Sequence, residues 1–410
     1  MGGTTHEKNK LSIAEKRLIG IESLQWCANN AVYFLGLIGA ATYDLAGTAF
    51  LVAAITLVRN LATSIGNVAA GSVIDSIGPR KTTVAVCAFS AVTSLSIGLG
   101  PITEASLIIA AAALGVSGGF INTCTHAYPG YLIATLMGRQ RLNGLMVFYS
   151  NIAFTLGPIF GGALVSTFST QSVYLFMAAA MAAAGVLALG CHEVLRPERE
   201  EDAKAGILSG MADGARMTLQ NHDLKLIFIS GFLGFFAFGA FDSLESLFYR
   251  DVLEVDVVWL GWLSSVVGFT SSIGAWLLTK LPDRMANLTL LLGSLFGVGV
   301  ASMIYVGTDI LAVAIVGQAI NGLAWGFLEP LQMILVQEKA PIAYLGRIMG
   351  FVRFGLMSAG VLPLLAAPAL AEAFGVQAVL FAASCIIALV GAVFFFGQVK
   401  RARSRVAQSE

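Results

Sequence analysis

The chain has 410 residues, of which 57% are hydrophobic and 12% are charged, and its formal net charge is zero. Average soluble domains contain about 25% charged residues, so this composition excludes a water-soluble globular protein. The balanced charge also excludes a strongly basic surface for nucleic acid, and we expect no nucleic-acid partner.

Twelve apolar segments follow one another along the chain, and a transmembrane helix needs about 20 such residues. They are centred near residues 29, 59, 90, 115, 155, 181, 237, 268, 297, 322, 359 and 386. The longest polar stretch between them divides the segments into two sets of six. The sequence therefore predicts an all-α membrane protein with twelve transmembrane helices in two six-helix bundles.

The polar stretches also set the predicted domain boundaries. We expect a cytoplasmic N-terminus at 1–17, a first bundle at 18–192, a cytoplasmic central loop at 193–222, a second bundle at 223–398 and a basic cytoplasmic tail at 399–410. The first apolar segment is not followed by a small-residue cleavage site, so we do not expect a cleaved signal peptide.

Lysine and arginine concentrate on one side of this layout. With the N-terminus inside, 21 of the 24 cations fall in cytoplasmic segments, and only Arg250 falls on the opposite side. Arg59 and Arg353 lie inside apolar segments. Cytoplasmic loops carry this excess of cations in membrane proteins. We therefore expect a multi-pass plasma-membrane protein with both termini in the cytoplasm. We also expect a monomer.

The loop after the second predicted helix carries an acidic residue between two glycines, followed by a basic pair. One glycine permits a tight turn, the carboxylate can meet the N-terminus of a neighbouring helix, and the cations can meet carboxylates or phosphates. We interpret these residues as a latch that holds the cytoplasmic helix ends together in one conformation. The latch residues are Gly71, Asp75, Gly78, Arg80 and Lys81.

This loop closely resembles the G-x-x-x-D-x-x-G-R-[RK] signature of the major facilitator superfamily, with Pro79 inserted before the basic pair. The fifth predicted helix resembles the antiporter motif g-x-x-x-G-P-x-x-G-G of drug-exporting members, through Gly157, Pro158, Gly161 and Gly162.

Two further runs, YDLAGTA at 43–49 and RLNG at 141–144, make the chain most similar to macrolide-efflux and siderophore-exporter members of that superfamily. The resemblance covers essentially the whole chain. It implies pseudo-symmetric bundles and transport by alternating access. The fourth predicted helix lacks the arginine that many proton-coupled drug exporters carry there, so proton coupling by their usual arrangement is not implied.

Ionisable residues inside predicted spans are costly when unpaired and are functional candidates by default. Asp242 and Glu245 are three residues apart and so are neighbours on a helix. Other interpretations remain open: Glu22 could pair with a cytoplasmic cation, Glu245 could be solvated by water, and Glu329 could satisfy backbone groups freed by Pro330. The candidates for proton coupling are Glu22, Arg59, Asp242, Glu245 and Glu329.

Polar and aromatic residues share helix faces with several of these charges and are candidates for lining a substrate cavity. His126 fits equally well as a packed polar residue. The candidate cavity residues are Trp26, Asn29, Tyr33, Asn122, His126, Gln318, Asn321 and Trp325.

These features predict a secondary active transporter, not an enzyme: a proton-coupled efflux antiporter for an amphipathic drug, macrolide or siderophore-like molecule. The chain contains no GxxxxGK[ST] nucleotide-binding motif, so we expect an ion gradient as energy source and no cofactor or metal. The expected partners are a small-molecule substrate, protons and the lipid bilayer. The alternatives are a solute importer or lipid flippase on the same fold, and a non-transporting membrane sensor or scaffold.

Overall fold

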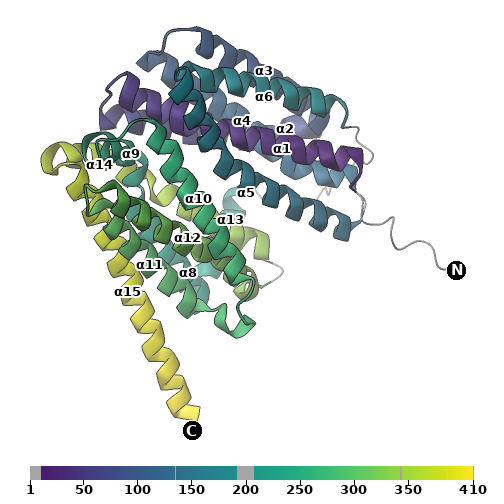
Figure 1. Ribbon diagram of the computed structural model, residues 1–410. Coiled ribbons are helices and arrows are strands. Elements are labelled where there is room, and N and C mark those ends of the chain that lie inside the picture. Colours follow the sequence, from purple (N-terminus) through teal and green to yellow (C-terminus); the bar gives the residue numbers. More distant parts are fainter. Residues whose placement is uncertain (1–10, 134, 192–206, 342–343, 410) are drawn as a thin grey trace. The chain divides into compact units, whose positions relative to one another are not determined.

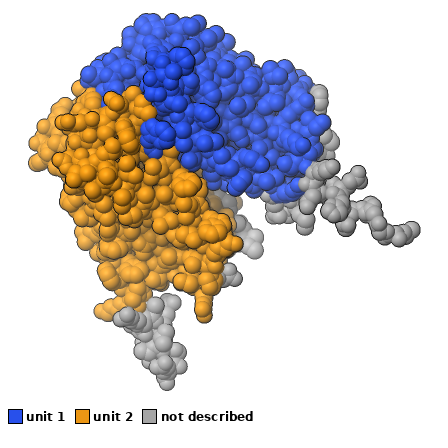
Figure 2. Space-filling view, in the orientation of Figure 1, with its two compact units in different colours: residues 1–46, 54–199, 260–262 blue, residues 47–53, 200–259, 263–410 orange. Residues whose placement is uncertain are grey.

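The structure, a computed structural model, describes residues 11–133, 135–191, 207–341 and 344–409. In these residues all regular structure is helical (Figure 1). The chain separates into two compact units: unit 1 comprises residues 1–46, 54–199 and 260–262, and unit 2 comprises residues 47–53, 200–259 and 263–410 (Figure 2).

The first half of the chain forms long helices joined by short turns. Helix α1 packs against α5 and α6, and α3 packs against α4 and α6. The helices are α1 (Ile13–Ala31), which continues directly into the π-helix η2 (Val32–Asp44), α2 (Ala49–Ile77), α3 (Pro79–Leu99), α4 (Glu104–Leu132), α5 (Leu136–Thr167) and α6 (Gln171–Leu189).

The second half contains two spans that are interrupted near their middle. Helices α8 and α9 together form one span, as do α13 and α14. The elements are α7 (Ile207–Gln220), α8 (His222–Phe238), α9 (Phe241–Asp251), α10 (Val258–Leu278), η3 (Asp283–Met285), α11 (Leu288–Val306), α12 (Leu311–Lys339), α13 (Leu345–Ala359), α14 (Val361–Phe374) and α15 (Val376–Ser409).

Eleven helical segments of the described residues are long and apolar enough to cross a membrane. The twelfth span is α1 with η2. Its first half carries polar side chains, among them Glu22, Gln25 and Asn30, which lower its mean hydropathy, whereas its second half is almost wholly apolar. The prediction of a twelve-helix, all-α membrane fold is confirmed.

The two interrupted spans touch each other at their interruptions. Gly239 lies between α8 and α9, and Gly360 lies between α13 and α14. A Cβ atom on Gly239 would overlap the carbonyl oxygen of Gly360. Only residues without side chains permit this approach of two backbones, so the glycine pair brings the two breaks into contact.

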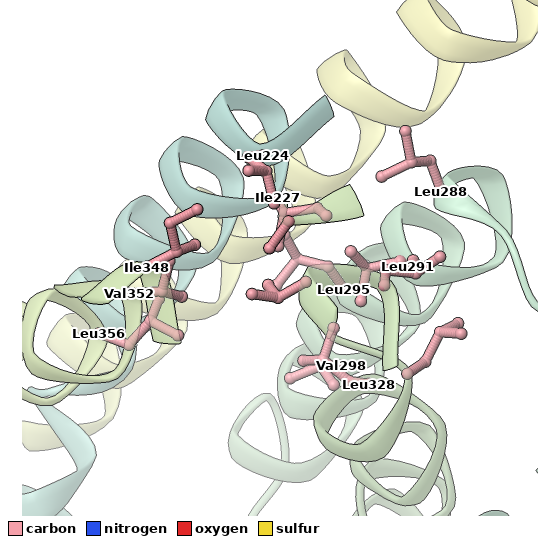
Figure 3. Packing of buried hydrophobic residues seen from close by; sticks show 14 of the residues in the cluster. Leu224, Ile227, Leu288, Leu291, Leu295, Val298, Leu328, Ile348, Val352 and Leu356 are labelled. Atoms are coloured by element: carbon pink, nitrogen blue, oxygen red, sulfur yellow. The ribbon is translucent and has the colours of Figure 1, made fainter. Parts of the chain in front are cut away.

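The core of unit 2 follows helical spacing. On α11 the residues Leu288, Leu291, Leu295 and Val298 share one face, and they pack with residues of α8, α12 and α13 (Figure 3). Intervals of three and four residues place side chains on one side of a helix. The core therefore forms where the inward faces of these helices meet, and Leu278 of α10 and Ile387 of α15 complete it.

Helix α7 lies in the segment between the predicted bundles, where the expected structure is a loop. It packs against α13. The Arg347 guanidinium lies 2.6 Å from an Asp213 carboxylate oxygen, and a Cβ atom on Gly214 would overlap the Arg347 carbonyl oxygen. Close backbone packing and an ion pair thus hold α7 to α13 within unit 2. Residues 192–206 of the predicted loop lie outside the described residues.

Candidate functional site

Glu245 is the centre of a hydrogen-bonded cluster in unit 2. Its Oε1 atom accepts hydrogen bonds from the Tyr249 hydroxyl at 3.2 Å, the Tyr305 hydroxyl at 2.9 Å and the Gln318 Nε2 amide at 3.0 Å. The donors come from α9, α11 and α12. One carboxyl oxygen therefore joins three helices, and it does so with neutral donors.

The cluster continues along α12. Gln318 Nε2 also donates to the Tyr249 hydroxyl oxygen at 3.3 Å, and Asn321 Nδ2 donates to Gln318 Oε1 at 3.3 Å. The Asn321 Oδ1 atom is buried and has no hydrogen-bond partner among the described residues. Buried polar atoms are nearly always paired, so this oxygen is an available acceptor at the end of the network.

Aromatic rings surround the carboxyl group. The Tyr305 ring packs edge-on against Phe248 and Tyr249, with centroid distances of 5.4 Å and 6.2 Å, and stacks with Phe241. Tyr249 and Tyr305 are buried, whereas Glu245 is only half-buried. The cluster thus places the carboxyl group inside a largely aromatic enclosure.

Glu245, Gln318 and Asn321 are among the residues predicted from the sequence, whereas the two tyrosines are not. Tyr249 lies four residues after Glu245, and this spacing brings side chains together on a helix, so the local sequence contained a signal for it. Tyr305 lies 60 residues away, and no local pattern links it to the carboxylate.

Replacing Tyr305 with Phe is expected to lower stability by about 1 kcal/mol, the net contribution of a typical hydrogen bond, and to change the pH dependence of transport. Tyr174→Phe is the matched control, because it also removes a buried hydroxyl, which donates to the Gly36 carbonyl at 2.7 Å in unit 1. Both variants should lose similar thermal stability. If Tyr305→Phe and Tyr174→Phe changed the pH dependence of transport equally, the Tyr305 hydroxyl would have only a structural role.

In unit 1, α1 carries a buried carboxyl group at its midpoint. Glu22 is 2% exposed, its Oε1 atom accepts a hydrogen bond from Trp26 Nε1 at 2.9 Å, and its Oε2 atom is buried without a hydrogen-bond partner among the described residues. The spacing of four residues puts Glu22 and Trp26 on one helix face, as the sequence predicts.

Arg59 and Tyr33 meet within unit 1. The Arg59 guanidinium carbon lies 4.2 Å from the centroid of the Tyr33 ring, which is within the range of a cation–π interaction. Arg59 is half-buried in α2, and Tyr33 lies at the start of η2. The 13-residue π-helix η2 thus begins beside a cation that lies within an apolar helix.

The remaining candidates for proton coupling and for the substrate cavity differ in how far they are exposed. Asp242, His126 and Glu329 are exposed, and Asn29 and Asn122 are half-buried. The His126 Nδ1 atom lies 2.8 Å from the Asn122 carbonyl oxygen on its own helix.

Trp325 packs edge-on against Phe235 and Phe238, each at a centroid distance of 5.3 Å. It therefore belongs to an aromatic cluster between α8 and α12.

The predicted latch loop contains an unusual turn and a helix cap. Gly78 has φ +86°, a left-handed conformation that favours glycine, and it immediately precedes α3. At the C-terminus of α6, Arg80 donates to the Leu189 carbonyl and Arg17 donates to the Gly190 carbonyl, each at 2.5 Å. The last carbonyls of a helix lack partners and attract cations. The side chain of Asp75 lies outside the described part of the chain.

Replacing Arg80 with Gln is expected to lower the stability of unit 1 by about 0.3–1 kcal/mol, the usual contribution of a cation at a helix C-terminus. Thermal unfolding of the purified protein would measure the change. Lys81→Gln is the control, because Lys81 is exposed, and it should have little effect. Equal unfolding temperatures for the two variants would contradict a capping contribution from Arg80.

The glycine motif of α5 packs that helix against α1. A Cβ atom on Gly157 would overlap the Cys27 carbonyl oxygen, and one on Gly161 would lie 3.1 Å from the Ala31 Cβ. Pro158 and Gly162 are also buried. Small residues let helices approach closely inside membranes. The motif thus fixes α5 against the part of α1 that follows Trp26.

Comparisons with known proteins agree on one family. The model of the Major Facilitator Superfamily matches residues 23–364. The multidrug efflux pump Tap of Mycobacterium tuberculosis is 25% identical over 362 residues, covering 85% of this chain and 84% of that protein. The multi-drug resistance efflux pump PmrA of Streptococcus pneumoniae is 24% identical over 283 residues, covering 67% and 68%.

Solved structures show the same fold at low identity. A point mutant of the nucleoside transporter NupG superposes with a TM-score of 0.75 at 12% identity and covers 93% of this chain and 98% of its own. A bacterial homologue of the human lysosomal transporter Spinster, in an inward-facing and unoccupied conformation, gives a TM-score of 0.71 at 14% identity and covers 96% and 97%.

Proposed function

Because the chain belongs to the major facilitator superfamily, we propose that it is a secondary active transporter that exports an amphipathic small molecule in exchange for protons. Two relatives named as multidrug efflux pumps support export as the direction. The observation that carries proton coupling is the half-buried Glu245, whose Oε1 atom accepts three hydrogen bonds from three helices. We further propose a monomer in the plasma membrane with cytoplasmic termini.

The Glu245 cluster supplies a physical link between a proton and helix packing. Hydrogen bonds to an ionised acceptor are roughly twice as strong as those to a neutral one. Protonation of Glu245 therefore weakens the attachment of α9 to Tyr305 on α11 and to Gln318 on α12, and proton release restores it. Since α9 begins just after the break at Gly239, it can change position as a short segment.

The unit 1 residues are proposed to serve the substrate. Trp26 offers an aromatic surface beside the Glu22 carboxyl group, and Arg59 with Tyr33 offers a cation and a ring. Amphipathic compounds need apolar contact together with a few polar groups that fix orientation. The proposed role of the loop at 71–81 is to hold the cytoplasmic helix ends together in one conformation.

Proteoliposomes with an acidic lumen test this function. An exchanger moves protons out of the lumen and an amphipathic dye such as ethidium into it, in whichever orientation the protein inserts. Dye should accumulate, and a protonophore should abolish the accumulation. Loss of preloaded dye along with protons would indicate a symporter and hence an importer. Absence of flux across a broad panel of amphipathic dyes would indicate a sensor or scaffold.

A further inference from the structure

A groove of about 530 Å³ lies in unit 2 between α8, α14 and α15. Every side chain that lines it is apolar, and half of the lining residues are alanines. Larger residues, including Phe236, Phe374 and Ile386, also line it. The hollow exists because small side chains leave space between large ones.

This groove is unfavourable both for water molecules and as empty space. A buried water molecule makes about three hydrogen bonds to polar groups, and the lining offers no polar side chain. Empty apolar space is unfavourable because the atoms around it lose dispersion contacts. The groove therefore favours an occupant that is wholly apolar over the part that enters.

The groove is continuous with the surface that faces the bilayer. Leu362, Phe374 and Ile386 at its edge are 64%, 70% and 50% exposed, and they belong to spans long and apolar enough to cross a membrane. On α14 the lining runs from Leu362 to Phe374, which is about 18 Å at 1.5 Å per residue. One leaflet of the roughly 30 Å hydrocarbon core has a similar depth.

We propose that this groove binds one acyl chain of a membrane phospholipid. Its apolar lining matches a hydrocarbon chain, its opening faces lipid, and its length matches one leaflet. An amphipathic substrate would have to leave its polar part without a partner there, which is unfavourable.

The acyl chain would contact both breaks of unit 2. Ala237 and Ala240 line the groove on either side of Gly239, and Leu362 and Pro363 line it just after Gly360. A bound chain therefore packs against the place where the two interrupted spans touch. Binding of a lipid chain in the groove can therefore affect the position of α9.

Photo-labelling of the full-length protein in nanodiscs tests the proposal. The probe is phosphatidylcholine with a diazirine in one acyl chain, and labelled peptides are identified by mass spectrometry. Labelling should concentrate on lining residues of α14 and α15, several-fold above the face of α3 around Val92, which is 65% exposed and lies on another span. Equal labelling of both surfaces would overturn the proposal.

Two variants of α15 provide matched controls. Ala382→Phe fills the groove from an exposed position, and Val393→Phe adds bulk to the same helix outside the groove. Labelling should fall several-fold in the first and stay unchanged in the second. Unchanged labelling in Ala382→Phe would contradict the proposal. The proposal would also fail if ethidium reduced the labelling and excess unlabelled phosphatidylcholine did not, because the groove would then bind the transported substrate.

Discussion

Replacing Glu245 with Gln is expected to reduce export driven by a pH gradient at least about tenfold, which corresponds to about 1.4 kcal/mol in the transition-state free energy. Glutamine has nearly the same shape and keeps an oxygen that can accept from Tyr249 and Tyr305. It cannot take up or release a proton, so the link between proton binding and α9 is lost. Dye accumulation in proteoliposomes with an acidic lumen would measure the loss.

Two carboxylates serve as comparisons. Asp309→Asn changes an exposed residue between α11 and α12, and it should leave export unchanged. Glu329→Gln removes the exposed candidate on α12. Dye exchange across the membrane without a pH gradient should survive in Glu245→Gln, because the proposed substrate contacts come from Trp26, Arg59 and Tyr33. If export by Glu245→Gln kept the wild-type pH dependence and export by Glu329→Gln lost it, Glu329 and not Glu245 would be the residue that carries the proton.

Replacing Gly157 with Ala is expected to lower stability by about 1–3 kcal/mol, the usual cost of overpacking, and to reduce export by a similar factor to the Glu245 change. The added methyl would overlap the Cys27 carbonyl oxygen. That oxygen belongs to helix backbone and cannot rotate away, so α5 must move from α1. Thermal unfolding followed by tryptophan fluorescence, together with dye accumulation, would measure both effects.

Gly144→Ala is the control on the same helix. A Cβ atom at Gly144 would meet nothing within 4 Å, and alanine favours helix over glycine by about 0.8–1.0 kcal/mol. This variant should therefore be at least as stable as the parent and transport normally. If the two alanine variants behaved alike, close packing at Gly157 would not explain the motif.

The sequence was sufficient for features that depend on short intervals. Twelve apolar segments predict the spans, and four-residue spacing predicts that Glu22 and Trp26 share a face of α1, where they form a hydrogen bond. The glycines of α5 indicate close packing, although the partner atoms on α1 cannot be read from a pattern. These features follow from helix geometry alone.

Features that depend on packing between distant segments were not predictable. Tyr305 reaches Glu245 only because the fold brings α11 within side-chain reach of α9. Arg80 reaches the Leu189 carbonyl only because α3 lies beside α6. The sequence suggested carboxylates or phosphates as partners of the basic pair, whereas Arg80 donates to a backbone carbonyl. The π-helical course of Val32–Asp44 also has no signal in residue spacing.

The contact between Gly239 and Gly360 restricts how unit 2 can change shape. Since the two backbones touch at their interruptions, a rotation of one outer helix segment about its break would sweep the neighbouring segment along with it. Helices α9 and α14, which belong to spans far apart in sequence, would then rotate together about a common axis. Glu245 lies on α9 and would move with them.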